Sequence, residues 1–461
     1  MGKWGTGLGS TPEAQEVQVR FAPPGSRVHA VPTGRKKGVW TARRTALIRP
    51  PLAWTPPRCP SFALCGGCAL QELRLDAQRV AKDAYGRSLV EDGLRRGGRD
   101  LSVSVRVHAP RGIASPYEYR NKVELSFGPS RFLREEALRR GEPIEGRFLG
   151  FHAPGRYDRV VDVDRCHLVG ESLNRLLAVT RAVALSEDAP SPYDPRDHSG
   201  FWRHLVLRRG MATGQTLAVL HTAPADERGV AAAARWGEAV RAADLGASTL
   251  AGALWVENAG LADVVRGEVR EVWGRDWFEE QVLGRTFRLS ATSFFQTSTA
   301  GAELLYRTVG EALGEGGGTL LDLYCGVGTI GLVLADRFDR VLGVEERAEA
   351  VADAQANAER NGVDWAEWRA GRVEDVLDLL QTEGALRAIV VDPPRPGLHP
   401  RVAEHLSQAV AEVLVYVACN PASLGRDAAV LMEGGWRLTD LWTVDLFPQT
   451  GHVEMVGRFS R

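Results

Sequence analysis

The sequence has no apolar stretch long enough to cross a membrane, and its first residues, MGKWGTGLGS, lack the apolar core of a signal peptide. It has no internal repeat and no long low-complexity tract, which excludes solenoid and fibrous architectures. Cysteine is scarce, and its six residues are clustered unevenly, which argues for ligands and a nucleophile rather than a disulfide framework. We therefore expect a cytoplasmic, multidomain protein of globular composition.

Acidic residues are nearly absent from the N-terminal region. Residues 1–58 contain ten Lys or Arg but only two acidic residues, Glu13 and Glu16. The whole chain has a net charge of −1, so the remainder carries about −9. A basic module on an acidic body predicts a contact with a polyanion such as RNA, and a solvated basic surface is the alternative.

Cys419 lies where a buried strand meets a helix. The apolar run Val413–Val417 predicts the strand, and Pro421 begins the turn into the helix. The carboxyl end of a strand in an α/β sheet is where such folds bind ligands, and a thiolate there is a potent carbon nucleophile. The competing interpretation of a lone cysteine is a small buried apolar residue.

A strand, a glycine turn and a helix precede Cys419 by about a hundred residues. The strand Leu320–Cys325 is followed by the spacing G-x-G-x-x-G, which indicates a turn that lets the backbone approach a ligand. The next strand, RVLGVE, ends in Glu345, which suits the two ribose hydroxyls of a nucleoside cofactor. NAD and S-adenosylmethionine both satisfy this pattern, but Asp322 favours the second, because its sulfonium and amino groups are cationic.

A stiff loop follows another apolar strand, Ala388–Val391. It begins with Asp392, and the next two residues are prolines, which have no backbone donor. Such a loop is either an ordinary strand-terminating turn or a wall that holds a planar ring extruded from nucleic acid. Its presence in the same sheet as the glycine turn and Cys419 favours the second interpretation.

The C-terminal part resembles the RNA methyltransferases that form 5-methyluridine by modifying carbon 5 of uracil. The matching segments, in the family's order, are SFFQ (293–296), DLYCGVGTIGL (322–332), GVE (343–345), DPPRPGL (392–398), YVACNPASLGRD (416–427) and HVEMV (452–456). The resemblance implies Cys419 as the nucleophile that adds to carbon 6 of uracil and Glu454 as the base that removes the carbon-5 proton. It implies that the residues binding S-adenosylmethionine are Gln296, Tyr324, Glu345 and Asp392.

A trio of cysteines, Cys59, Cys65 and Cys68, is followed far downstream by Cys166. Spacing alone leaves a 4Fe–4S cluster, a structural zinc ion and metal-free thiols open. The resemblance favours the cluster, because many family members carry C-x5-C-G-G-C and a later cysteine around one. We therefore predict a 4Fe–4S cluster on these four residues, with a structural role, because methyl transfer needs no electron.

The predicted fold class is α/β, with a C-terminal doubly wound, Rossmann-like methyltransferase domain, a β-rich central domain and a small N-terminal β module. We expect the boundaries to be residues 1–58 for a short module like the TRAM domain, an RNA-binding β-barrel, residues 59–280 for the central domain, and residues 281–461 for the methyltransferase domain. The central domain is predicted to begin with a helix, Leu70–Leu94, after the cysteine loop.

RNA is the expected partner, bound by a monomer that does not contact a membrane. Family members that carry the cysteine cluster tend to modify large-subunit ribosomal RNA, so 23S-type rRNA is favoured and tRNA is the alternative. A non-catalytic iron–sulfur protein that binds RNA is a further alternative, disfavoured by the joint presence of the predicted catalytic residues. Further candidates are His452 for catalysis, with a structural role as the alternative. For RNA contact they are Arg120, Asn121, Lys122, Arg203 and His204, with an ordinary solvated strand face as the alternative.

Overall fold

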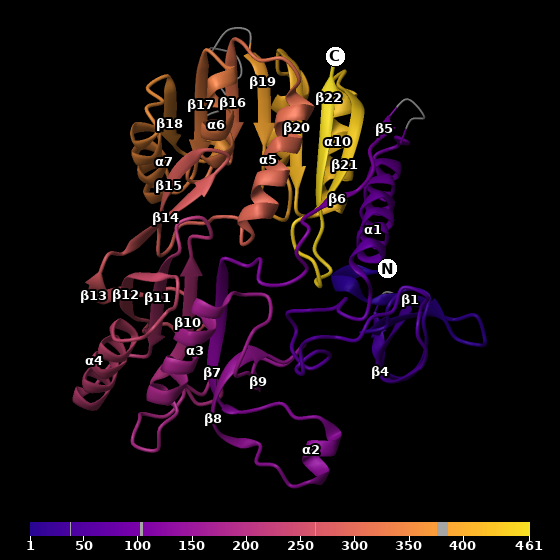
Figure 1. The fold of residues 1–461 in the computed structure, drawn as a ribbon. Coiled ribbons are helices and arrows are strands. Elements are labelled where there is room, and N and C mark those ends of the chain that lie inside the picture. The colour runs from indigo at the N-terminus through magenta and orange to yellow at the C-terminus, as the bar shows by residue number, and fades with distance from the viewer. Residues whose placement is uncertain (37, 102–104, 263, 376–385) are drawn as a thin grey trace.

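A computed structural model describes residues 1–36, 38–101, 105–262, 264–375 and 386–461 (Figure 1). The N-terminal module is a sheet in the order β1-β2-β4-β3, preceded by the short helix η1 (Lys3–Gly5). Its strands are β1 (Gly7–Ser10), β2 (Glu16–Arg20), β3 (Arg27–Lys36) and β4 (Val39–Arg49).

The central sheet has the order β13-β12-β11-β10-β7-β8-β9. Its strands are β7 (Lys122–Ser130), β8 (Glu145–His152), β9 (Val160–Asp162), β10 (Trp202–Arg209), β11 (Gln215–Thr222), β12 (Thr249–Glu257) and β13 (Glu268–Gly274). Strands β8 and β9 pair antiparallel as a hairpin. Helices α3 (Glu171–Ala184) and α4 (Glu227–Arg241) pack on one face of this sheet, and α2 (Glu135–Arg139) lies in the β7–β8 connection.

The C-terminal sheet has the order β18-β17-β16-β19-β20-β22-β21-β5, and β6 also pairs with β21. Its strands are β5 (Arg106–Val107), β6 (Arg111–Gly112), β16 (Thr319–Leu323), β17 (Arg340–Glu345), β18 (Ala366–Ala370), β19 (Leu386–Val391), β20 (Ala411–Ala418), β21 (Arg437–Asp445) and β22 (Glu454–Ser460). Strands β16 to β20 run parallel to one another, and only β22 runs antiparallel to β20. This is the predicted doubly wound sheet with a closing hairpin.

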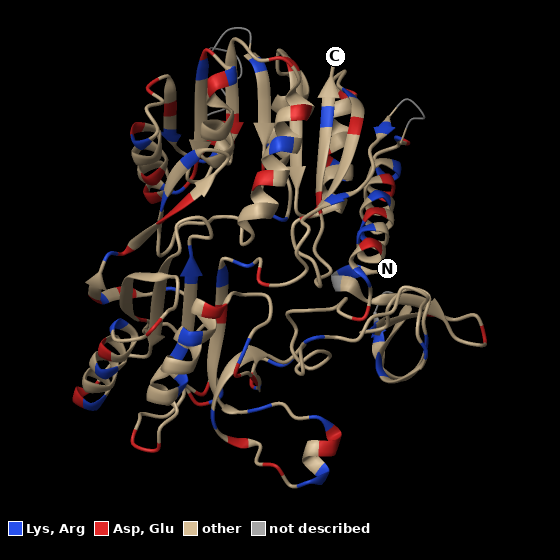
Figure 2. Ribbon diagram, in the orientation of Figure 1, with Lys and Arg blue, Asp and Glu red and all other residues tan. Residues whose placement is uncertain are grey.

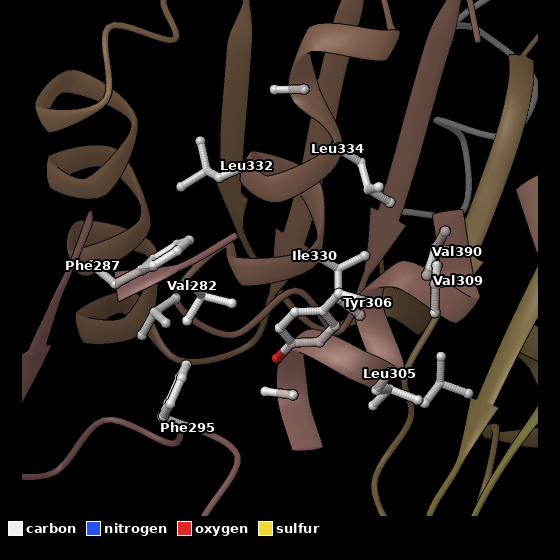
Figure 3. Packing of buried hydrophobic residues seen from close by; sticks show 14 of the residues in the cluster. Val282, Phe287, Phe295, Leu305, Tyr306, Val309, Ile330, Leu332, Leu334 and Val390 are labelled. Atoms are coloured by element: carbon white, nitrogen blue, oxygen red, sulfur yellow. The ribbon is translucent and has the colours of Figure 1, made fainter. Parts of the chain in front are cut away.

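Helices lie on both faces of the C-terminal sheet (Figure 1). They are α1 (Leu75–Arg96), α5 (Thr299–Leu313), α6 (Thr329–Leu334), α7 (Ala348–Arg360), α9 (Pro400–Gln408) and α10 (Pro421–Glu433), with the short helices η2 (Ala335–Arg337) and η3 (Val373–Asp375). A hairpin of β14 (Trp277–Val282) and β15 (Arg285–Ser290) joins this region to the central sheet. Apolar side chains of α5 and α6 meet those of the hairpin and the sheet in one core (Figure 3). No helix in the described ranges is both long and apolar enough to span a bilayer.

Helix α1 packs against α10 in the C-terminal region, although it was predicted as part of the central domain. It begins at Leu75 rather than Leu70, because residues 70–73 form a turn in which Leu73 N–H donates to Leu70 O. The α1 and α10 backbones touch where Gly93 meets Gly425, and a Cβ atom at Gly93 would lie 2.8 Å from the Gly425 Cα. The segment between the cysteine loop and residue 112 therefore contributes a helix and two short strands to the methyltransferase sheet.

Candidate functional site

The predicted site residues gather at one edge of the C-terminal sheet. The parallel strands end there at Leu323, Val391 and Ala418, and Glu345 ends the neighbouring strand β17. The antiparallel strand β22 begins at the same edge, because Met455 pairs with Ala418. Cys419 and Glu454 are the next residues on the two strands, so the antiparallel register sets them opposite each other.

The glycine turn after β16 closes on the end of β17. Gly326 and Gly328 have φ values of 57° and 78°, a region that favours glycine, and Tyr324 also has a positive φ of 64°. The two carboxylate oxygens of Glu345 accept hydrogen bonds from the N–H groups of Gly326 (3.1 Å) and Arg347 (3.0 Å). The acidic end of β17 is thereby fixed against the turn.

Asp322 is a buried carboxyl beneath that turn. Its Oδ2 atom accepts the Gly331 N–H at 2.9 Å, whereas Oδ1 has no hydrogen-bond partner within the described ranges. Burial raises its pKa to about 7, and the nearby acid Asp392 acts in the same direction. A cationic group above the turn would satisfy this oxygen, which fits the amino and sulfonium groups of S-adenosylmethionine and disfavours a pyrophosphate.

Asp392 and the residues after it form a loop that is held against the start of α10. Burial raises the pKa of Asp392 to about 7, and its backbone N–H donates to Leu323 O at 3.3 Å. Asn420 Nδ2 donates to Arg395 O at 3.0 Å, which ties the loop to the residue next to Cys419. This loop and the thiol therefore belong to one site.

The carboxyl of Glu454 perturbs the Cys419 thiol electrostatically. Burial, with a smaller contribution from the carboxyls of Glu454 and Asp392, raises the pKa of Cys419 to about 11, against the lowering effect of the positive charge of Arg395. Burial also holds the pKa of Glu454 well above its ordinary value, and Asp392 adds to this effect. One thiol and two carboxyls thus share a largely buried site, in which full ionisation of all three acids is costly, and the exposed Arg395 lies near enough to lower the pKa of the thiol.

Gln296 is almost fully buried immediately before α5, and its neighbour Phe294 is 66% exposed. Asn121 Nδ2 donates to Gln296 O (2.9 Å) and to Thr299 Oγ1 (3.0 Å), which joins the central sheet to this segment. The chain departs from the resembling family at Thr297-Ser298. Here the Ser298 hydroxyl accepts the Gly301 N–H at 3.1 Å and caps the helix.

The sequence prediction missed Tyr306, whose ring extends from α5 into the apolar core (Figure 3). Burial raises its pKa, and the carboxyls of Asp392, Asp322 and Glu454 raise it further. A buried tyrosine at helical spacing is usually a core residue, so the sequence offered no signal for this position. His452 lies near the same site, where burial and the charge of Arg120 lower its pKa to about 4 and keep it neutral at pH 7.

The predicted RNA contacts on the central sheet are wrong for three residues. Asn121 is buried and makes the contacts described above. Arg203 is 2% exposed, and its guanidinium donates to the carbonyls of a loop, those of Asn258, Gly260 and Ala262. His204 is also buried. Alternation along a strand separates two faces but does not reveal which face another segment will cover.

Cys59, Cys65, Cys68 and Cys166 line a single cavity of about 50 Å³. Burial raises the pKa of Cys65 and of Cys68 to about 12, and the neighbouring thiols contribute to both shifts. Gln71 Oε1 accepts the Cys59 N–H at 3.1 Å, which fixes the loop. No group of His, Cys, Asp or Glu in the described part of the chain is close enough to be identified as a metal site.

Residues 269–459 match the family model described as tRNA (Uracil-5-)-methyltransferase. The chain is 35% identical to an uncharacterized RNA methyltransferase of Caldanaerobacter subterraneus over 97% of this chain and 94% of that protein. It is 32% identical to an uncharacterized RNA methyltransferase of Clostridium tetani, over 96% and 92% of the two chains. Its fold is similar to that of the Pyrococcus abyssi tRNA (uracil-54, C5)-methyltransferase bound to S-adenosyl-L-homocysteine, with a TM-score of 0.72, 24% identity, and coverage of 98% and 100% of the two chains.

Proposed function

We propose that this chain, which belongs to the family of S-adenosylmethionine-dependent RNA uracil-5-methyltransferases, modifies 23S-type ribosomal RNA through a covalent bond between Cys419 and the target uracil. The observation that carries the proposal is the register of β20 and β22, which sets Cys419 opposite Glu454 beside Asp392. The thiol, the acid and the loop wall are the three parts that such a reaction needs.

Carbon 5 of uracil is a weak nucleophile, and Cys419 overcomes this by adding to carbon 6. The new sulfur–carbon bond pushes the double-bond electrons toward the carbonyl oxygen at carbon 4, so carbon 5 becomes an enolate carbon. S-adenosylmethionine, when bound, supplies an electrophilic methyl group to that carbon. Glu454 then removes the carbon-5 proton, the double bond re-forms and the Cys419 thiolate leaves.

The cofactor is held, in this proposal, by Gln296, Tyr324, Glu345 and Asp392. Glu345 still has lone pairs for ribose hydroxyls, because each of its oxygens accepts one backbone N–H in the structure. The unpartnered Oδ1 of Asp322 adds a further acceptor for a cationic group. Tyr324 and Glu345 adjoin the glycine turn, and Asp392 begins the loop that follows β19 at the same edge of the sheet.

We propose a 4Fe–4S cluster on Cys59, Cys65, Cys68 and Cys166. Supporting it are the shared cavity, the close spacing of three of the thiols and the resemblance to cluster-bearing family members. Four cysteine thiolates are the common ligand set of this cluster. Its role here would be structural, since the reaction transfers no electron.

Anaerobically purified protein should be brown and contain about four irons per chain. The Cys65→Ser protein should lose the iron and unfold at a lower temperature, because cluster binding and folding are coupled. Iron and zinc analysis with thermal unfolding measures both effects. Cys325→Ser is the matched control, since Cys325 lies by the glycine turn, and this variant should keep its iron. Stoichiometric zinc with negligible iron would contradict the proposal.

The basic N-terminal module supports an RNA substrate. Arg20, Arg27, Arg35, Arg43 and Arg49 are exposed on this module, and Figure 2 marks the positions of its Lys and Arg residues along the ribbon. Phosphate contacts of this kind give affinity without selecting a sequence. We propose that residues 1–58 act as this RNA-binding module of a monomeric enzyme.

The alternative substrate is tRNA, supported by the names of the matching family model and of the similar P. abyssi enzyme. The two are distinguished with transcripts that carry tritium at carbon 5 of uridine, because methylation releases that tritium to water. We expect tritium release from 23S-type rRNA fragments at a kcat/KM well above that for bulk tRNA. Equal or faster release from tRNA would assign the enzyme to tRNA, and release from neither would favour a non-catalytic RNA-binding protein.

A further inference from the structure

The connection between β21 and β22, residues 446–453, ends directly at Glu454. Its tip is Gln449, which is buried and has a φ of 70°, a backbone conformation that residues other than glycine seldom adopt. The Gln449 carbonyl accepts two hydrogen bonds from the cysteine loop, from the N–H groups of Ala69 (2.7 Å) and Leu70 (2.9 Å). Ala69 follows the proposed cluster ligand Cys68, so the two functional regions are in direct contact.

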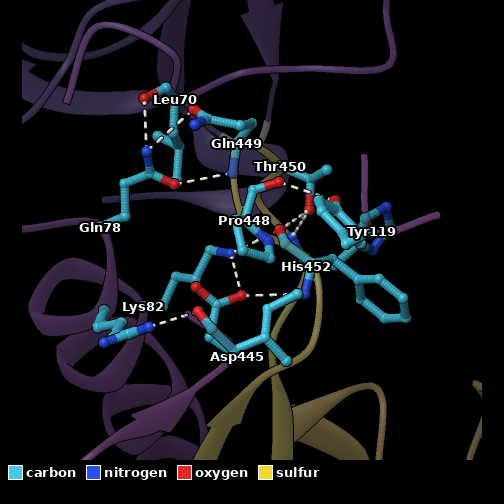
Figure 4. Close-up of polar contacts among 12 residues, drawn as sticks. Leu70, Gln78, Lys82, Tyr119, Asp445, Pro448, Gln449, Thr450 and His452 are labelled. Atoms are coloured by element: carbon cyan, nitrogen blue, oxygen red, sulfur yellow. Dashed lines mark hydrogen bonds and ion pairs between the residues drawn. The ribbon is translucent and has the colours of Figure 1, made fainter. Parts of the chain in front are cut away.

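Gln78 of α1 makes the second attachment to this tip (Figure 4). Its Oε1 accepts the Gln449 N–H at 2.8 Å, and its Nε2 donates to Gln449 Oε1 at 3.0 Å. The same Nε2 also donates to the carbonyls of Leu70 (3.1 Å) and Leu73 (2.8 Å). One fully buried amide therefore joins the cysteine loop to the connection that precedes Glu454.

Lys82 and Tyr119 hold the rest of the connection. Lys82 Nζ pairs with Asp445 Oδ1 at 2.6 Å, both side chains are buried, and Nζ also donates to Phe447 O at 2.9 Å. The Tyr119 hydroxyl donates to Pro448 O at 2.8 Å. Tyr119 packs in the small apolar cluster that also contains Cys68 and Cys166, so this bond too starts from the cysteine cavity.

We propose that these contacts form a clamp that positions Glu454 for removal of the carbon-5 proton. The clamp consists of Gln78, Lys82, Tyr119 and the backbone N–H groups of Ala69 and Leu70. A carboxylate can accept a proton only when one of its oxygens is held within hydrogen-bonding distance of the donor atom. The clamp fixes residues 446–453, which lead directly into Glu454, and so holds the Glu454 carboxylate in place. The clamp also makes the geometry of the base depend on an intact cysteine loop. This inference rests on the proposed role of Glu454.

Two variants remove clamp contacts, Tyr119→Phe and Gln78→Ala. Tyr119→Phe deletes one buried hydrogen bond and keeps the ring, so it is the variant that tests the clamp if Gln78→Ala fails to fold. The matched control is Thr180→Val, which deletes the acceptor of a buried bond from Trp236 Nε1 (3.0 Å) between α3 and α4, away from the site. We expect both clamp variants to slow removal of the carbon-5 proton and to accumulate a protein–RNA adduct through Cys419. The slowing should be about tenfold in Tyr119→Phe, which loses one buried hydrogen bond, and larger in Gln78→Ala, which loses the four side-chain bonds of Gln78.

Thr180→Val should lower the unfolding temperature without accumulating adduct. Normal turnover without adduct in Tyr119→Phe would overturn the positioning role. The Glu454→Gln protein is the reference. If it accumulates adduct and the clamp variants do not, the clamp is overturned and the role of Glu454 stands. If neither accumulates adduct, the role of Glu454 as the base, on which the clamp rests, is overturned.

Amide hydrogen exchange tests whether the 446–453 connection depends on the cysteine loop, and it needs no RNA or cofactor. Exchange across residues 446–453 should rise in Cys65→Ser, and unchanged exchange would overturn the dependence on the cysteine loop.

Discussion

Replacing Cys419 by alanine should abolish methylation while leaving the binding of S-adenosylmethionine nearly intact. The thiol contacts uracil in the proposed mechanism, whereas the cofactor is held at the glycine turn and Glu345. Without the addition at carbon 6, carbon 5 never becomes an enolate carbon, so the rate should fall by roughly 10⁴-fold or more. Tritium release from labelled RNA measures the rate, and calorimetry measures cofactor affinity.

A fluorine atom at carbon 5 of the target uridine tests the same step from the substrate side. It cannot leave as a proton does, so wild-type protein should remain bonded to 5-fluorouridine RNA on a denaturing gel. Cys419→Ala should form no such adduct, and Cys325→Ala, which alters the other cysteine outside the cluster quartet, should still form it. Methylation by the Cys419→Ala protein would contradict the covalent mechanism.

The strands that carry this chemistry were predictable because they are short apolar runs that end at polar residues. The strands ending near Glu345, Asp392 and Cys419 lie where the hydrophobic pattern predicts them. The pairing of β22 between β20 and β21 was not readable from local pattern, because sheet order depends on contacts between distant segments. The neighbourhood of Cys419 and Glu454 was therefore implied only by family resemblance.

Helix α1 shows why a domain boundary was harder to predict than a helix. Its buried residues include Gln78, Lys82 and Asp83, so it has no apolar stripe to indicate which surface it covers. Its packing depends on glycines that let two backbones approach and on polar side chains whose partners lie more than 350 residues away. Such partners leave no local signal in the sequence.

The Glu454→Gln protein should stall after methyl transfer and accumulate a covalent adduct with RNA. An amide cannot take the carbon-5 proton, so the ring keeps both that proton and the new methyl group, and the thiolate cannot be expelled. Burial holds the pKa of the native Glu454 carboxyl well above its ordinary value, which makes it a stronger base than an exposed carboxylate. Turnover should therefore fall sharply, although addition and methyl transfer still occur.

The stalled adduct should survive a denaturing gel, carry the transferred methyl label and disappear when Cys419 is also replaced by alanine. Glu280→Gln is the matched control, because Glu280 is an equally buried glutamate whose carboxylate accepts the backbone N–H groups of Met211 (2.7 Å) and Ala212 (3.0 Å) away from the thiol. That variant should lose stability but accumulate no adduct. Normal turnover by Glu454→Gln would contradict the role of Glu454 and would assign proton removal to His452 or water. Cys419 would keep its role as the nucleophile.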